Sequence, residues 1–148
     1  MKGDFTRFTH DPARHYTGVL KQQGRVDLDA DWNEQLAIQH TLERTEATDV
    51  IGPSGAPVSG GGFEIVAVSS AGDDLEISAG RIYVDGILCE NAANVKYTAQ
   101  ADYPEPPALS PADRRTDLGY LDVWERHITA IEDPDIREVA LGGPDTTT

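Results

Sequence analysis

The sequence predicts an α+β protein, with two N-terminal helices followed by a small antiparallel β domain and extended arms rich in glycine and proline. Three observations predict this fold. Apolar residues recur at helical spacing before residue 51, they alternate after residue 63, and a segment of Gly, Pro, Ser, Ala and Val separates the two regions. We therefore expect a helical segment at 1–51, a linker at 52–62 and a β domain at 63–148.

The first helix is predicted from residue 12 to about residue 23. Asp11 can cap its start, and Pro12 would occupy the first helical position, where a missing N–H costs nothing. Gly24 stands where a left-handed residue commonly ends a helix. The apolar residues at helical spacing within this segment are Tyr16, Val19 and Leu20.

The second helix is predicted at 30–51. Asp29 or Asp31 can cap its start, and Gly52-Pro53 ends it. One stripe of this helix contains Trp32, Leu36, Ala47 and Val50, and it also contains the polar residues Gln39 and Glu43. Because an unpaired glutamate is rarely buried, the middle of this stripe is expected to be wet or to pair with another chain.

The β domain is predicted from short alternating segments at 63–68, 74–78, 81–84, 87–90 and 95–98. Asp85-Gly86 joins two of them and predicts a hairpin with a type I′ turn. A proline-rich connector at 103–111 should be extended, and alternation at 118–131 predicts a further strand.

Charge and hydropathy exclude two classes of partner. The chain has 12 Lys and Arg against 26 Asp and Glu, a net charge of -14, so we expect no binding to nucleic acid or anionic membranes. No apolar run approaches the ~20 residues that cross a bilayer, and the N-terminus has no signal-peptide pattern. Together with the single cysteine, Cys89, this predicts folding in the cytoplasm without membrane insertion.

No motif in the sequence predicts catalysis. Asp27-x-Asp29-x-Asp31 is superficially like a calcium loop, but Trp32 and Ile38 stand where that loop needs glycine and glutamate, so helix capping is favoured. Cys89 alternates as a strand residue, and a hydrolytic carboxylate pair could form only between residues that the sequence does not single out. We expect no enzyme, catalytic residue, metal or cofactor. The histidines are too scattered for a metal motif: His10, His15, His40 and His127.

Four blocks of the sequence resemble an uncharacterised domain family found in gene clusters for phage tails and phage-tail-like extracellular contractile injection systems. The first block is Asp11-Pro-Ala-Arg-His-Tyr16 with Val19-Leu-Lys-Gln-Gln-Gly-Arg-Val-Asp-Leu-Asp-Ala-Asp-Trp-Asn-Glu-Gln35. The later blocks are Ala79-Gly-Arg-Ile-Tyr-Val-Asp-Gly-Ile-Leu88, Tyr120-Leu-Asp-Val-Trp-Glu-Arg126 and Arg137-Glu-Val-Ala-Leu-Gly-Gly-Pro-Asp145.

The resemblance implies a structural subunit or attachment module in the baseplate, spike or fibre region, and a chain that continues beyond residue 148 in longer relatives. Its partners would be other tail or baseplate subunits and further copies of itself, in a trimer or a higher ring, within a particle that can leave the cell. Extended arms and an open sheet suit strand addition between subunits. The helical segment would dock on a partner through the candidate interface residues Tyr16, Leu20, Trp32, Leu36, Gln39 and Glu43.

An alternative is a carbohydrate- or surface-binding module of a tail fibre. This alternative would use Trp124 and Tyr120 on an exposed strand face. Loss of glycan binding on Trp124→Ala would favour it.

Overall fold

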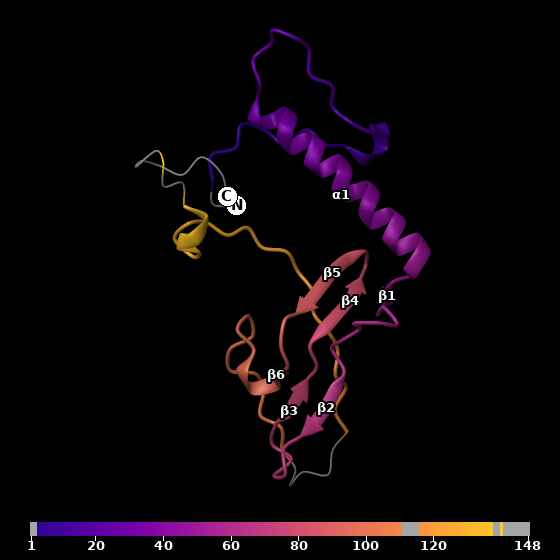
Figure 1. Ribbon diagram of the computed structural model, residues 1–148, viewed down its shortest axis with the longest axis vertical. Helices are drawn as coiled ribbons and strands as arrows, with labels where there is room; N and C mark the ends of the chain where they lie inside the picture. Colours follow the sequence, from indigo (N-terminus) through magenta and orange to yellow (C-terminus); the bar gives the residue numbers. More distant parts are fainter. Residues whose placement is uncertain (1–2, 111–115, 138–139, 141–148) are drawn as a thin grey trace. The chain divides into compact units, whose positions relative to one another are not determined.

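The computed structural model describes residues 3–110, 116–137 and 140 (Figure 1). The chain divides into two units, residues 1–40 with 122–148 and residues 41–121. The first unit contains an extended N-terminal segment, residues 3–28, and the start of the only α-helix among the described residues. The second unit contains two small three-stranded sheets.

Helix α1 (Asp29–Ile51) confirms the second predicted helix. It begins with hydrogen bonds from the backbone N–H groups of Asp31 and Trp32 to the Leu28 carbonyl, at 3.1 and 3.5 Å. It ends at Gly52, whose φ of 94° is left-handed and whose N–H donates to the Thr48 carbonyl at 2.8 Å. Pro53 follows and cannot continue the helix.

The first predicted helix, at 12–23, is wrong, so the expected pair of N-terminal helices does not exist. The segment forms one 3-10 turn, η1 (Pro12–Arg14), which the Asp11 carboxylate caps by accepting from the Ala13 N–H at 3.0 Å. His15 has a left-handed φ of 54° and ends the turn. Thr17-Gly-Val19 has low helix propensity, and Leu20 is almost fully exposed, so no packing compensates for it.

The first sheet, with strand order β1-β4-β5, is antiparallel. Its strands are β1 (Ser54–Gly55), β4 (Gly80–Val84) and β5 (Ile87–Asn91). The turn between β4 and β5 has φ values of 47° at Asp85 and 75° at Gly86. Two positive φ values are what a type I′ turn requires, so this predicted hairpin is confirmed.

The second sheet, with strand order β2-β3-β6, is also antiparallel, and a register irregularity lies between Ile65 and Ala67. Its strands are β2 (Ile65–Val68), β3 (Leu75–Ile77) and β6 (Val95–Lys96). After β6 the chain turns into the 3-10 helix η2 (Tyr97–Ala99), so the strand predicted at 95–98 is shorter than expected.

A carboxylate joins β3 to the start of η2. The Thr98 hydroxyl and backbone N–H donate to Asp74 at 2.8 and 3.3 Å. Loss of hydration opposes ionisation of Asp74, but the hydrogen bonds from Thr98 and Leu75 and the charge of Lys96 together outweigh it and hold the pKa of this carboxyl below its usual value.

Two predicted extended regions differ from expectation or lie partly outside the described residues. The strand expected at 118–131 is wrong: the described residues 116–131 contain no strand, and Leu118 and Ile131 are exposed. Alternation supplies side chains of the right type, but a strand also needs the edge of a neighbouring strand to pair with.

The proline-rich connector is described up to residue 110, and the Tyr97 hydroxyl donates to its Pro107 carbonyl at 3.0 Å. Near the C-terminus, the 3-10 helix η3 (Pro134–Ile136) follows.

Among the described residues, three hydrophobic residues are buried: Ala30, Ile38 and Ala130. All three belong to the first unit. The described part of the second unit therefore buries no hydrophobic residue, although it contains all the strands. The segment 52–62 contributes β1 and a bridge between Gly61 and Arg81.

Candidate functional site

The N-terminal segment is held beside the beginning of α1 by polar side chains of the helix. The first contact is at Asp29, whose two carboxylate oxygens accept from the Thr6 backbone N–H at 3.0 Å and from the Thr6 hydroxyl at 2.8 Å. These hydrogen bonds, the backbone one first, keep the pKa of Asp29 below its usual value. The predicted capping aspartate therefore also anchors a distant part of the chain.

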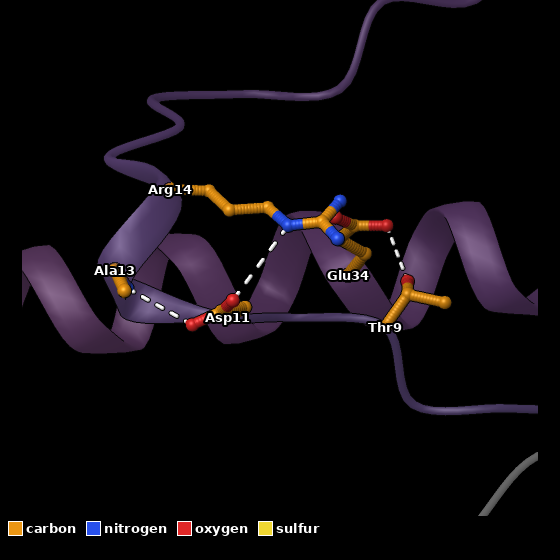
Figure 2. A network of polar contacts seen from close by, with 5 residues as sticks. All are labelled: Thr9, Asp11, Ala13, Arg14 and Glu34. Atoms are coloured by element: carbon orange, nitrogen blue, oxygen red, sulfur yellow. Dashed lines mark hydrogen bonds and ion pairs between the residues drawn. The ribbon is translucent and has the colours of Figure 1, made fainter.

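A second contact lies one turn further along the helix. The Thr9 hydroxyl donates to the Glu34 carboxylate, next to the turn that Asp11 caps (Figure 2). Asp11 also lies 3.6 Å from Nε of Arg14, in an exposed ion pair that adds little stability. Figure 2 shows that η1 lies next to α1.

A third contact comes from an amide side chain. The Val19 backbone N–H donates to Oε1 of Gln35 at 2.7 Å. An added Cβ at Gly18 would lie 3.3 Å from the same oxygen, so a small residue permits this close approach. The three contacts, at Asp29, Glu34 and Gln35, fasten the N-terminal segment to the first two turns of the helix.

An aromatic cluster connects the start of the N-terminal segment to the C-terminal part of the first unit. The Phe5 ring lies 5.6 Å from the Phe8 ring and 5.6 Å from the His127 ring, the latter edge-on at 74°. Such tilted geometries are favourable for aromatic pairs. His127 therefore has a packing role.

The candidate interface residues are all exposed. Trp32 is 58% exposed and Leu36 is 38% exposed, one turn apart on α1, and Gln39 and Glu43 continue the same helical stripe. Tyr16 and Leu20 are also exposed, but they lie in the N-terminal segment and not on a helix.

The residues of α1 that are buried are Ala30 and Ile38, which lie away from the predicted stripe. Sequence reasoning missed them because apolar residues are scattered around this helix. No periodic signal separates Ile38 from Leu36. Which of the two side chains is covered depends on contacts that form only in the folded chain.

The described residues contain no group of three or more His, Cys, Asp or Glu side chains placed to hold a metal ion. Within the Asp27-x-Asp29-x-Asp31 pattern, Asp27 pairs with Nζ of Lys21 at 3.1 Å and Asp29 binds Thr6. Two shallow hollows formed by the described residues have volumes of about 170 and 130 Å³, below the range typical of small-molecule sites. Burial raises the pKa of the Cys89 thiol, which opposes a nucleophilic role.

The aromatic residues of the carbohydrate-binding alternative are exposed as well. Trp124 and Tyr120 both have more than half of their surface in solvent. The strand that was expected to present them on one face does not form.

Among the described residues, no helix is long and apolar enough to cross a membrane.

The sequence profile of a family of unknown function, DUF6519, matches residues 1–148. The chain belongs to this family. The DUF6519 match covers both units, so the helix, the two sheets and the N-terminal segment all lie within the family's domain. No curated protein and no solved structure matches the chain.

Proposed function

We propose that this DUF6519 protein is a structural subunit or attachment module of a contractile phage-tail-like injection particle. It would lie in the baseplate, spike or fibre region and act through protein-protein assembly. The assignment to such a particle rests on the resemblance of the four sequence blocks. The assembly role is supported by how the chain distributes its apolar surface.

One observation carries the assembly role: α1 turns Trp32 and Leu36 to solvent, while the described part of the second unit buries no hydrophobic residue. Burying one large apolar side chain stabilises a protein by about 1.5–3 kcal/mol. A chain of this length is long enough to bury a core. Its exposed apolar residues are therefore best explained as surface that neighbouring subunits cover.

The stripe on α1 is suited to a subunit interface. Trp32 and Leu36 are apolar and lie one turn apart near the start of α1. Gln39 and Glu43 continue the stripe with polar groups. Interfaces combine buried aromatic anchors with a polar rim in the same way. Tail assemblies are symmetric, so we propose that the subunit occurs in repeated copies, as a trimer or a higher ring.

Light scattering on the purified chain, alone and mixed with baseplate proteins encoded in the same gene cluster, tests this proposal. We expect a defined oligomer or complex, and we expect its affinity to fall at least tenfold in a Trp32→Glu, Leu36→Glu variant. Val58→Glu is the matched control, because Val58 is fully exposed and belongs to the segment after β1 and not to α1. A well-folded monomer that binds none of these baseplate proteins would contradict the proposal.

The second candidate is glycan binding by a fibre module, favoured by the exposure of Trp124 and Tyr120. Aromatic rings in solvent can stack on sugar rings through their apolar faces. Glycan binding that Trp124→Ala abolishes and Trp32→Ala leaves intact would select this function over assembly.

A further inference from the structure

The four outer strands of the two sheets are protected to very different degrees. Natural proteins protect edge strands by making them short or by placing charges on them, because an open edge can pair with another chain. Strands β1 and β6 have only two residues each, and β6 carries Lys96. Strand β5 is longer, but Glu90 lies on it and its exposure alternates between half-buried and exposed.

Strand β2 is the exception. All four of its residues are apolar and all four are exposed, with Ile65 at 62%, Val66 at 52% and Val68 at 65%. It pairs with β3 on one side, and no other strand of the described residues pairs with its outer edge. A bulge can also protect an edge, and the register of β2 against β3 shifts at Val66, but here the shift leaves every side chain in solvent.

Hydrogen bonds fix both ends of β2. At the C-terminal end, Oγ of Ser69 accepts from the backbone N–H groups of Asp73 and Asp74 at 3.0 and 3.1 Å, and the Ser69 N–H donates to the Asp74 carbonyl at 2.9 Å. At the other end, the Glu64 N–H donates to Oγ of Ser78 at 3.0 Å. The strand is thus held in an extended form that an incoming segment need not order, which lowers the entropic cost of binding.

The charges around β2 define the chemistry of the segment that would bind. The second sheet and its turns carry four acidic residues against one basic residue: Glu64, Asp73, Asp74 and Glu76 against Lys96. A second copy would bring the same acidic excess to the edge, whereas an apolar strand with basic residues at its ends would be attracted by it.

We propose that the outer edge of β2 receives an extended apolar segment of a neighbouring subunit as an additional strand, with lysine or arginine at the ends of that segment. Main-chain hydrogen bonds supply affinity in this mode, and the apolar side chains and flanking charges supply selectivity. This inference rests on the proposed assembly function and adds a second contact surface, separate from the stripe on α1.

The test uses the full chain and a dye-labelled synthetic peptide of alternating valine and threonine with two lysines at each end. Fluorescence anisotropy should show saturable binding, and a peptide with glutamates in place of the lysines should bind at least tenfold more weakly. Two variants, Val66→Lys and Val66→Glu, should each weaken binding at least tenfold. Val66 has no partner in the β3 register, so the fold should tolerate both changes.

The two variants separate strand addition from simple charge attraction. If the peptide only responded to charge, Val66→Glu would bind it more tightly than the original chain. Leu88→Lys on the protected strand β5 is the matched control and should leave the affinity within about twofold. Circular dichroism establishes that each variant is folded.

The inference is overturned if the lysine peptide shows no saturable binding or if the Val66 variants bind it normally. It is also overturned if the chain dimerises through β2, seen as a doubled mass that Val66→Lys abolishes, because the occupant would then be a second copy. Incorporation of the chain into its complex without any peptide binding would reject only this inference. Peptide binding by the Trp32→Glu, Leu36→Glu variant would show that the two surfaces act separately.

Discussion

The N-terminal segment and the β4–β5 hairpin are stabilised in opposite ways. The hairpin pairs five residues with five others across a two-residue turn, through backbone hydrogen bonds. The N-terminal segment is fastened to α1 by side chains that lie 16 to 25 residues away in the sequence. The hairpin is thus specified locally, whereas the N-terminal segment depends on a few exposed or partly buried polar contacts that can open separately.

The largest difference between the two regions should appear at their left-handed glycines. An added Cβ at Gly86 in the hairpin would lie 2.5 Å from the Arg44 carbonyl oxygen, whereas nothing lies within 4 Å of one at Gly24. Both have positive φ, so alanine costs strain at each. We expect Gly86→Ala to lower the free energy of unfolding by about 3 kcal/mol and Gly24→Ala by about 1 kcal/mol. The difference arises because the added methyl group at Gly86 would also push against the backbone of Arg44, whereas the one at Gly24 meets nothing.

Denaturant unfolding followed by circular dichroism measures both losses of stability. Equal losses in the two variants would mean that the hairpin does not pack against Arg44 as described. Far-ultraviolet spectra of the variants at zero denaturant show whether either change removes a whole element.

A smaller effect is expected when the N-terminal segment loses its first contact. Asp29→Asn removes the charge that accepts both Thr6 hydrogen bonds, so the Thr6 amide should exchange with solvent several-fold faster. Asp31→Asn is the control, because Asp31 lies in the same helical turn. Hydrogen exchange followed by nuclear magnetic resonance measures this, and unchanged Thr6 protection in Asp29→Asn would contradict the contact.

The N-terminal segment and the hairpin should also respond differently to acid. The pKa of Asp29 in the folded chain lies below its usual value of 3.8, so its contact with Thr6 contributes fully above that pH and is lost as the pH falls through the lowered pKa. The Thr6 amide resonance should therefore shift at strongly acidic pH, while the amide resonances of Ile82 and Cys89, which pair in the middle of the hairpin, stay constant. Simultaneous shifts would show that both regions unfold together and not separately.

The smallest effect concerns the cysteine of the hairpin. Burial raises the pKa of the Cys89 thiol above 9.0, so less thiolate is present at neutral pH and alkylation should be several-fold slower than at an exposed cysteine. An Ala13→Cys, Cys89→Ser chain supplies the exposed reference, because Ala13 lies in the N-terminal segment. Equal alkylation rates would place Cys89 in solvent.

The same contrast explains what the sequence could predict. Asp85-Gly86 and Gly52-Pro53 act on their immediate neighbours, so the hairpin turn and the end of α1 follow from local rules. The helix expected at 12–23 fails because Thr17-Gly-Val19 has low helix propensity and the Val19 N–H donates to the Gln35 side chain, a contact 16 residues away that no local pattern predicts.

The candidate interface was only partly predictable for a related reason. The polar residues Gln39 and Glu43 correctly marked the α1 stripe as unsuited to a buried core. An open sheet was expected, but the sequence did not single out β2 as its exposed edge, because strand order depends on which segments pair. Whether the six interface residues bind a partner remains a prediction.

Fluorescence of Trp32 tests the central claim most directly. Trp32 and Trp124 are the two tryptophans of the chain, so Trp124→Phe leaves Trp32 as the single reporter on the α1 stripe. In the free chain its emission should be that of an exposed indole, since its side chain is largely in solvent. On formation of the complex with its baseplate neighbours the emission should shift to shorter wavelength as the ring is buried. An unchanged spectrum in a complex whose mass is established by light scattering would contradict docking through α1.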